Sequence, residues 1–201
     1  MIVVVDYGMG NLRSVQKGFE KVGSAAVISR DIGKIANASR LVLPGVGAFP
    51  ECMKNLASLN LIDPILEFIE SGRPFLGICL GLQLLFEESE EFGIHDGLKV
   101  IPGRVKGFER NMGLKIPHMG WNEVLFRKET PIFRGIPDGA FFYFVHSFYV
   151  EPLNISDIAA ESGYGITFTC AVSRDNVFAV QFHPEKSQEN GLRILKNFAT
   201  L

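Results

Sequence analysis

Two stretches of the chain carry residues that could perform covalent chemistry together. In the first, an apolar run from Phe75 to Ile78 stops at Cys79, which stands between Gly77 and Gly81. This Gly-x-Cys-x-Gly spacing is typical of a nucleophile elbow, in which a strand turns sharply into a helix and exposes the nucleophile. The first turn of a helix also stabilises a thiolate through its free N–H groups and its dipole. The alternative is a small apolar cysteine that only packs at a strand end.

The second stretch supplies the groups that a reactive thiol needs. A strand-like run from Val177 to Phe182 stops at His183, and Glu185 follows two residues later. A histidine activates a cysteine by taking its proton, and a carboxylate holds the imidazole in the required tautomer. Taken alone, this stretch is also what an ordinary strand end looks like. Together, the two stretches predict a catalytic triad of Cys79, His183 and Glu185.

Both stretches resemble the class I (triad) glutamine amidotransferases, in the Gly-Ile-Cys-Leu-Gly elbow and in the distant Gln-Phe-His-Pro-Glu sequence. Within that family, the chain is similar to the glutaminase subunits of imidazole glycerol phosphate synthase, an enzyme of histidine biosynthesis. The closer resemblance covers essentially the whole chain. It is carried by Pro-Gly-Val-Gly at 44–47, Pro-His-Met-Gly-Trp-Asn at 117–122, Tyr-Phe-Val-His-Ser at 143–147 and His-Pro-Glu-Lys-Ser at 183–187.

The resemblance implies hydrolysis of L-glutamine to glutamate and ammonia through a thioester on Cys79. The developing oxyanion is expected to meet the N–H of Leu80 and, after a rearrangement, the segment of Val46 and Gly47. Read without the resemblance, that segment is also an ordinary loop that needs glycine for positive φ. The residues expected to hold the glutamine are Gly45, Gln83 and Ser147. No cofactor and no metal is expected, because hydrolysis at a thiol needs neither.

The same resemblance implies a partner chain. The ammonia is expected to pass to a cyclase subunit, a (β/α)8 barrel, which makes imidazole glycerol phosphate and an aminoimidazole carboxamide ribotide, and the two chains are expected to form a heterodimer. Stretch 117–122 is predicted to be an exposed loop, although a lone tryptophan usually fills a core. The residues expected at the interface are Asn11, His118, Met119, Trp121 and Lys186.

Other functions stay open at this point. A glutaminase for anthranilate or pyridoxal phosphate synthesis would share the triad, and stretch 117–122 argues against it. A general cysteine hydrolase or peptidase of similar fold would accept other substrates. A non-catalytic, flavodoxin-like binding module would not need the three triad residues.

The composition of the chain limits the classes of protein to which it can belong. The chain has 201 residues, of which 47% are hydrophobic and 21% charged, as in an ordinary globular domain. A net charge of −2 gives no reason to expect binding to nucleic acid or to a membrane. Three cysteines, Cys52, Cys79 and Cys170, are too few for a disulfide framework. We expect one amidotransferase domain over residues 1–201, in the cytoplasm.

The first half of the chain alternates short apolar runs with helical patterns. Strands are predicted over 2–5, 25–28, 41–43 and 75–78, and helices over 12–22, 32–38, 56–69 and from Cys79 to about Glu91. This alternation predicts an α/β fold with a parallel, doubly wound, flavodoxin-like sheet. Ligands bind such sheets beyond the carboxyl ends of the strands, where Cys79 is placed. Gly8-x-Gly10 is only a weak dinucleotide signal, because Arg13 stands where the third glycine would be.

After Gly97, glycine, proline and aromatic residues punctuate shorter runs. These runs predict mixed or antiparallel strands added to the same sheet, over 100–101, 104–108, 123–126, 141–150, 167–172 and 177–182, with a last helix over 188–201. His146 lies in the most apolar of these runs. We interpret it as a hydrogen-bonded core histidine rather than a catalyst.

Overall fold

The apolar runs of the first half form neighbouring parallel strands. The computed structural model describes residues 1–109 and 113–201. Its strands β2, β1, β3 and β4 lie in that order, and all are parallel. They span Ile2–Val5 (β1), Ala26–Ser29 (β2), Arg40–Gly45 (β3) and Phe75–Cys79 (β4). Every residue of β1 and β4 is buried, which explains why these runs show no polar alternation.

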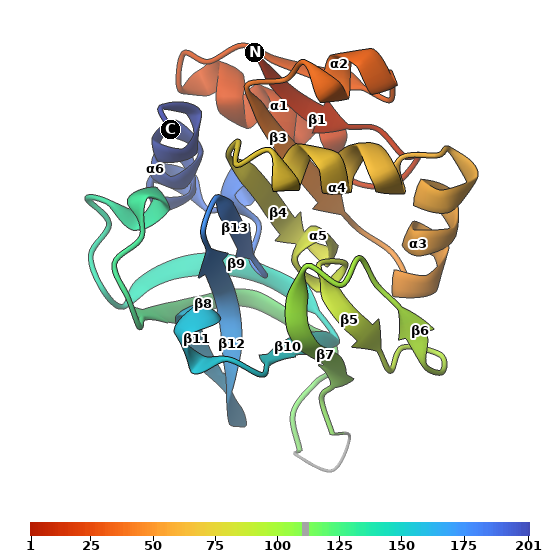
Figure 1. Ribbon diagram of the computed structural model, residues 1–201. Coiled ribbons are helices and arrows are strands. Elements are labelled where there is room, and N and C mark those ends of the chain that lie inside the picture. The colour runs from red at the N-terminus through yellow and green to blue at the C-terminus, as the bar shows by residue number, and fades with distance from the viewer. Residues whose placement is uncertain (110–112) are drawn as a thin grey trace.

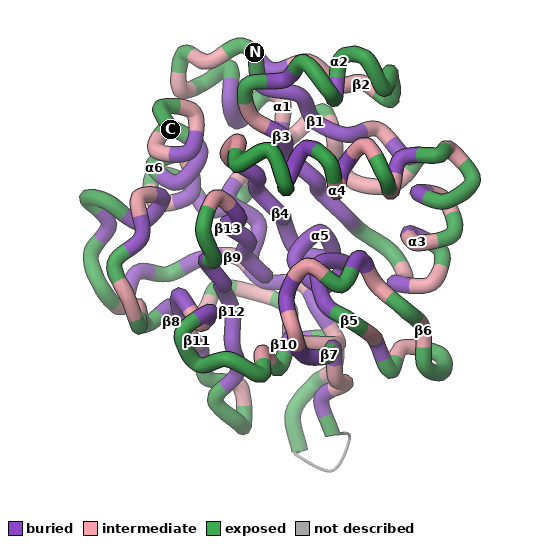
Figure 2. The backbone as a smooth tube through the Cα atoms, in the orientation of Figure 1, coloured by how far each residue is buried: buried purple, intermediate pink, exposed green. Residues whose placement is uncertain are grey.

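Helices cover both faces of this parallel part (Figure 1). Residues Phe19 and Phe198 of α1 and α6 pack in one core cluster, whereas Phe49 and Phe68 of α3 and α4 pack in another. Alternate strand residues contribute to each cluster, so the buried strands run between two layers of helices (Figure 2). The helices span Leu12–Lys21 (α1), Ile32–Ala36 (α2), Phe49–Ser58 (α3), Ile62–Glu70 (α4), Leu80–Gln83 (α5) and Gln188–Ala199 (α6).

Strand β13 joins the parallel part to the second half of the sheet. It is parallel to β4 on one side and antiparallel to β12 on the other. Beyond β12 the order is β10, β7, β5 and β6, while β11 pairs with β12 and β8, and β8 pairs with β9. The bounds are Phe86–Ser89 (β5), His95–Asp96 (β6), Ile101–Gly107 (β7), His118–Phe126 (β8), Ala140–His146 (β9), Phe148–Pro152 (β10), Ile158–Tyr164 (β11), Ile166–Arg174 (β12) and Val177–Val180 (β13). The predicted α/β fold, with mixed and antiparallel strands added to a parallel half, is confirmed.

The helix predicted from Cys79 to about Glu91 is wrong in its length. Helix α5 makes a single turn over Leu80–Gln83, and the chain then continues as β5. Strand β5 pairs with β7 and β6, so its backbone groups are satisfied by the sheet and not by a helix. Tertiary pairing overrides the helical spacing of apolar residues here.

Two other predictions about the elements are also wrong. The single helix expected over 56–69 is two helices, α3 and α4, and Asn60 between them has a φ of +54°, which a continuing helix does not allow. Stretch 117–122 is not a loop, because His118 begins β8, whose backbone pairs with β9. Strand β11 was not predicted. Within the described residues, no helix combines the length and the apolar character that a membrane span requires.

The turn between β4 and α5 depends on two close approaches. Cys79 has a φ of +55° and a ψ of −111°, a conformation that is strained for a residue with a side chain. A Cβ atom added to Gly81 would lie 1.8 Å from the carbonyl oxygen of Leu43 in β3. One added to Gly77 would lie 2.7 Å from the carbonyl oxygen of Gly81. A side chain fits at neither position: the missing one at Gly81 lets the elbow lie against β3, and the missing one at Gly77 lets the chain fold back on itself.

We expect Gly81→Ala to lower the free energy of unfolding by about 2 kcal/mol or more, because the added methyl group collides with strand backbone that cannot move aside. The measurement is the midpoint of urea unfolding. Gly163→Ala is the matched control, since a Cβ atom there meets nothing within 4 Å. Equal midpoints for the two variants would contradict the close-approach explanation.

Candidate active site

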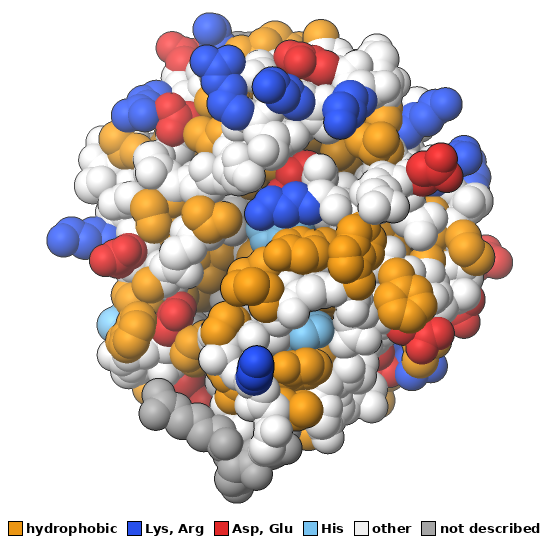
Figure 3. Space-filling view, turned by 180° about the vertical axis from the view of Figure 1, so that it is seen from behind, with side chains coloured by type: hydrophobic (Ala, Val, Ile, Leu, Met, Phe, Trp, Pro, Cys, Tyr) orange, Lys and Arg blue, Asp and Glu red, His pale blue; other side chains and the backbone are white. Residues whose placement is uncertain are grey.

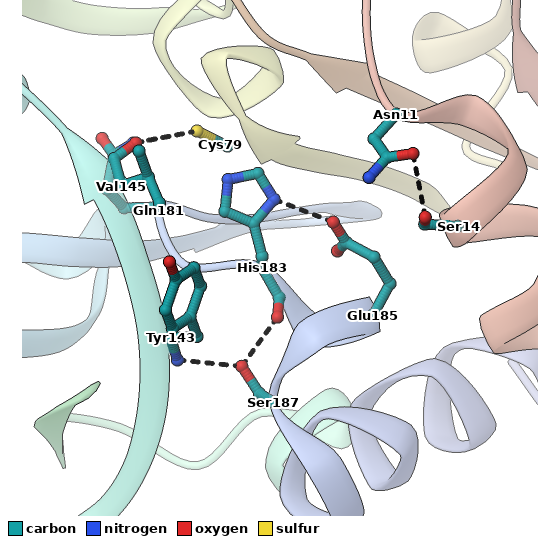
Figure 4. A network of polar contacts seen from close by, with 9 residues as sticks. All are labelled: Asn11, Ser14, Cys79, Tyr143, Val145, Gln181, His183, Glu185 and Ser187. Atoms are coloured by element: carbon teal, nitrogen blue, oxygen red, sulfur yellow. Dashed lines mark hydrogen bonds and ion pairs between the residues drawn. The ribbon is translucent and has the colours of Figure 1, made fainter. Parts of the chain in front are cut away.

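The three predicted triad residues meet at the carboxyl edge of the sheet. Cys79 ends β4, and His183 follows shortly after β13, the parallel neighbour of β4. The imidazole of His183 lies between the thiol and Glu185 (Figure 4). Its Nδ1 is 2.8 Å from Oε1 of Glu185, and the two side chains are only 5% and 1% exposed. The strand order thus brings together residues that are more than a hundred positions apart in sequence.

The backbone around His183 is held from two sides. Its N–H donates to the carbonyl of Tyr143 in β9 at 2.9 Å, and its own carbonyl accepts from the Ser187 hydroxyl at 2.7 Å. The same hydroxyl accepts from the N–H of Tyr143 at 3.0 Å (Figure 4). A single 3-10 turn, Pro184–Lys186, then points Glu185 back at the imidazole. The contacts with Tyr143 and Ser187 therefore fix the position of His183, and the turn that carries Glu185 fixes the orientation of its ring.

The environment of His183 favours its charged form. Burial alone lowers the pKa of this imidazole, but hydrogen bonds and charge from Cys79 and Glu185 outweigh burial and raise the pKa to about 10. At neutral pH the ring therefore carries two protons, one of them shared with the carboxylate. A charged imidazolium beside the thiol favours a thiolate, which is the nucleophilic form of cysteine.

Two polar groups besides His183 lie near the sulfur of Cys79. Nε2 of Gln181 is 3.7 Å from Sγ, and the carbonyl oxygen of Val145 is 3.8 Å away. The sequence predicted that a helix dipole would stabilise the thiolate, but α5 has only one turn. Because a macrodipole sums over aligned peptides, one turn contributes less than the long helix that was expected.

A cavity of about 310 Å³ opens beside the thiol, large enough for an amino acid. Its wall includes Cys79 and His183 together with five residues expected from the sequence, Val46, Gly47, Leu80, Gln83 and Ser147. Val46 is 39% exposed, and Gly47 has a φ of +98°. The carbonyl of Val46 faces the Cys52 thiol at 3.7 Å.

Two of the expected substrate contacts need correction or refinement. Gly45 does not line the cavity, because it is the buried last residue of β3, paired with Cys79 across the sheet. A Cβ atom there would lie 2.8 Å from both Leu80 and Tyr7, so Gly45 serves close packing. Gln83 does line the cavity, but its Nε2 donates to Phe148 and Gln181 at 3.1 Å and 3.0 Å. Its Oε1 is the atom left for a ligand.

Sequence reasoning missed two polar residues at this site. Glu91 lines the cavity, its carboxylate accepts the N–H of Phe49 at 2.7 Å, and burial raises its pKa. No sequence signal singled it out, because it stood at the end of an expected helix. Gln181 lies beside the thiol and is 0% exposed. Its signal was a polar residue in the apolar run 177–182.

The residues expected at a partner interface divide into two groups. Met119 and Trp121 are 61% and 45% exposed, whereas His118 is 3% exposed, because successive strand residues point to opposite faces. The interface prediction for His118 is therefore wrong. Its Nδ1 lies 2.8 Å from Nε2 of His146, which is buried and hydrogen-bonded as predicted.

Lys186 and Trp121 lie near the same aromatic ring. Nζ of Lys186 is 5.8 Å from the centre of the Tyr143 ring, and the ring of Trp121 is 6.1 Å from it. Asn11 is exposed at the start of α1, on the side of the site where Glu185 lies (Figure 4). In the view from behind Figure 1, hydrophobic side chains gather around a hollow in the middle of the molecular surface (Figure 3).

The pKa of His183 predicts a pH-dependent contribution to stability. Because the folded-state pKa of about 10 lies above the ordinary value of 6.5, the contribution is fully present below pH 6.5 and is lost as the pH rises toward 10. We expect Glu185→Gln to shrink this contribution, since it removes the negative charge paired with the imidazolium. The measurement is urea unfolding of both proteins across this pH range.

The difference between the two unfolding curves reports on His183 together with Cys79, whose contacts also raise the pKa of the imidazole. Burial raises the pKa of Cys52 to about 11, and that thiol titrates alike in both proteins. A stability difference that does not change between neutral and alkaline pH would contradict the charged state assigned to His183.

Comparisons with known proteins agree with this geometry. The family model "Glutamine amidotransferase class-I" matches residues 3–201. Proteins named "Imidazole glycerol phosphate synthase subunit HisH" are 60% identical in Syntrophotalea carbinolica, over 100% of both chains, and 56% identical in Geobacter metallireducens, over 98% of this chain and 97% of that one.

Solved structures share the fold at lower identity. "Crystal structure of glutamine amidotransferase" superposes with a TM-score of 0.77 at 19% identity over 100% of both chains. "Structure of PurLQS from Thermotoga maritima" superposes with a TM-score of 0.77 at 17% identity, over 99% of this chain and 97% of that one. The fold, the family match and the full-length relatives agree, and the chain belongs to the class I glutamine amidotransferases, in the group of the HisH subunits of imidazole glycerol phosphate synthase.

Proposed function

We propose that this chain hydrolyses L-glutamine and delivers the ammonia to the cyclase subunit of imidazole glycerol phosphate synthase, in histidine biosynthesis. The observation that carries the proposal is the buried His183–Glu185 pair beside the Cys79 thiol, at the wall of a cavity that fits an amino acid. Membership of the amidotransferase family supports the choice of glutamine over other substrates of cysteine hydrolases.

The chemistry follows from the order of the three side chains. The Cys79 thiolate attacks the side-chain amide carbonyl of glutamine, and the imidazolium of His183 gives its proton to the departing ammonia. The neutral imidazole then takes a proton from water, which attacks the thioester and releases glutamate while the thiolate re-forms. Glu185 holds Nδ1 throughout and stabilises the charged ring. The proposed donors to the oxyanion are the N–H of Leu80 and, after a rearrangement of the segment of Val46 and Gly47, the N–H of Gly47. Each such donor is worth roughly 2.7–4 kcal/mol in other enzymes.

Three side chains on the cavity wall are suited to hold the rest of the glutamine. The half-buried carboxylate of Glu91 has one oxygen bound to the N–H of Phe49, and its other oxygen is suited to the α-ammonium group. Oε1 of Gln83 can accept a further N–H from the substrate, because its nitrogen is already occupied. Ser147 lies on the same wall and can bond to the substrate through its hydroxyl.

We propose that the cyclase partner, a (β/α)8 barrel, forms a heterodimer through the surface beside this cavity. Four exposed apolar side chains lie on the paired strands β8 and β9, namely Met119, Trp121, Leu125 and Phe141. Exposed tryptophan is a frequent hot spot of protein interfaces. Lys186 adds a charge at the cavity wall, and Asn11 adds an exposed amide near Glu185. A partner seated here would cover the exit that ammonia needs.

Two broader expectations belong to the same proposal. We treat residues 1–201 as one amidotransferase domain, because both core clusters are built on the same sheet. A cytoplasmic location stays a prediction from the sequence, in keeping with three free cysteines.

We expect Cys79→Ala to abolish ammonia release from glutamine while thermal unfolding stays close to that of the unchanged chain, since the substitution removes one atom at the cavity wall. A chloroketone analogue of glutamine should alkylate Cys79, as read by peptide mass spectrometry. His183→Ala should lose nearly as much activity, because triad residues act as a unit.

The control sites for this labelling are the two other thiols. Cys52 and Cys170 are buried, and burial raises the pKa of each. Labelling at either thiol in place of Cys79, or near-normal turnover by His183→Ala, would overturn the assigned mechanism.

We expect Trp121→Ala to weaken binding of the barrel by about 2 kcal/mol or more, roughly thirty-fold in Kd, because an exposed aromatic anchor is lost. Lys186→Ala is expected to weaken binding or the stimulation of glutamine hydrolysis by the barrel. Binding is measured by titration calorimetry, and hydrolysis with the barrel present and absent.

Two control variants test whether the loss of binding depends on where the substituted side chain lies. Ile155→Ala removes an apolar side chain that is 84% exposed, and Lys34→Ala removes an exposed lysine of α2. Both should bind the barrel normally. Unchanged binding and stimulation in the Trp121 and Lys186 variants would place the partner on another surface.

A further inference from the structure

A fully buried amide lies next to the nucleophile and is not part of the triad. Gln181 follows β13, is 0% exposed, and places Nε2 3.7 Å from Sγ of Cys79. Its Oε1 accepts from Nε2 of Gln83 at 3.0 Å. Burying an amide costs free energy unless it is hydrogen-bonded, so an apolar side chain would serve packing better here. The position therefore calls for an explanation beyond the core.

The orientation of the Gln181 amide is determined by its neighbours. The carbonyl oxygen of Phe148 can only accept, and it receives Nε2 of Gln83 at 3.1 Å. Gln83 must therefore present its NH₂ group on this side, and its second N–H points at Gln181. The oxygen of Gln181 is thereby committed to Gln83, and its nitrogen is left facing the sulfur. A reversed Gln181 amide would place two donors, its own Nε2 and that of Gln83, against each other.

A pair of neutral histidines braces the same carbonyl. Burial lowers the pKa of His118 to about 4 and that of His146 to about 3, so each ring carries a single N–H at neutral pH. Nδ1 of His146 donates to the oxygen of Phe148 at 2.9 Å, which leaves its Nε2 to accept from Nδ1 of His118 at 2.8 Å. Nε2 of His118 then accepts from Asn122 at 3.2 Å.

The chain of hydrogen bonds ends at a second fixed acceptor. The other N–H of Asn122 donates to the carbonyl of Gly163 at 2.8 Å, and Oδ1 of Asn122 accepts the N–H of Glu123 at 2.8 Å. The backbone carbonyls of Gly163 and Phe148 can only accept hydrogen bonds. They therefore determine which group donates in each hydrogen bond between Gly163 and the Cys79 thiol. Such a fully satisfied network holds its members in one arrangement.

We propose that Gln181 is a positioning residue for the proposed glutaminase reaction, which holds the Cys79 thiolate through its Nε2–H and is itself held in the donating orientation by Gln83 and the Phe148 carbonyl. A thiolate accepts a hydrogen bond better than a thiol or a thioester sulfur does. The contact therefore stabilises the anion before attack and keeps the sulfur at the cavity wall. The inference rests on the proposed function, because it assigns a role in that reaction.

The test measures thiolate reactivity directly, without glutamine or a partner. Iodoacetamide alkylation of Cys79 is followed in the full chain by mass spectrometry between about pH 5 and pH 10, because only the thiolate reacts. Other titratable groups around the sulfur or on the cavity wall are unchanged between variants, namely His183, Glu185, His146, Tyr7, Cys52, Glu91 and Lys186. A difference between variants therefore reports on Gln181.

We expect Gln181→Met to alkylate about ten-fold more slowly at acidic and neutral pH, with rates that converge with those of the unchanged chain at alkaline pH, where Cys79 is a thiolate in both proteins. In hydrolysis, kcat should fall while KM for glutamine changes little. Gln181→Glu keeps the volume but replaces the donor by a carboxylate, and it should be slower still. If Gln181→Met fails to fold, Gln181→Glu decides by the same measurement.

Gln16→Met is the matched control, because it removes a partly buried amide whose Nε2 donates to the carbonyl of Ala26, away from the thiol. It should leave the alkylation profile unchanged. The inference is overturned if Gln181 variants alkylate as fast as the unchanged chain, or if the slowing is the same at every pH. Failure to release ammonia from glutamine would instead reject the proposed function, while alkylation still decides the role of Gln181.

Discussion

The whole site depends on one buried charge. The carboxylate of Glu185 is 1% exposed and makes one hydrogen bond to an imidazole that is itself 5% exposed. Within the described part of the chain its Oε2 has no hydrogen-bond partner, so the His183 ring is the group that compensates the charge. A buried carboxylate without a compensating charge would lower the free energy of unfolding by roughly several kcal/mol. Contacts with Cys79 and with this carboxylate thus raise the pKa of the imidazole above its ordinary value.

That pairing holds only because the sheet delivers its members to one edge. Strand β4 brings the Cys79 thiol, and the segment after β13, its parallel neighbour, brings His183. Strand β13 is also the place where the sheet changes from parallel to antiparallel, so the second half of the chain meets the first at the site. The carbonyl of Tyr143 in β9 then accepts the backbone N–H of His183, and the Ser187 hydroxyl, which accepts the N–H of Tyr143, donates to the His183 carbonyl. The antiparallel half therefore contributes the frame in which the base is held.

The parallel half and the triad could be predicted from the sequence for physical reasons. Strands such as β1 and β4 are buried on both faces, and Cys79 and His183 each stop an apolar run abruptly. The other elements depend on the pairing of strands that are distant in sequence, which no local pattern reveals. The apolar spacing around Phe86 fits a helix as well as a strand, and only its pairing with β7 settles the choice.

The same limit applies to individual side chains. His118 and Trp121 are near neighbours in sequence, yet one is buried and the other exposed, because stretch 117–122 pairs as a strand and not as a loop. Glu91 and Gln181 reach the site through a turn and a strand end whose directions follow from the whole sheet. Gln181 carried a readable signal, a polar residue within an apolar run, whereas Glu91 carried none.

Strand β8 has a consequence for how this protein can change over time. Its odd positions, with Met119 and Trp121, face outward, while His118 faces inward and Asn122 bonds to it. Substitutions at odd positions meet the solvent or a neighbouring chain, so they can drift with whatever binds there. Substitutions at His118 or Asn122 meet a closed set of donors and acceptors, where a single exchange leaves a buried group unsatisfied. The two faces of one strand thus differ in how freely they accept a substitution.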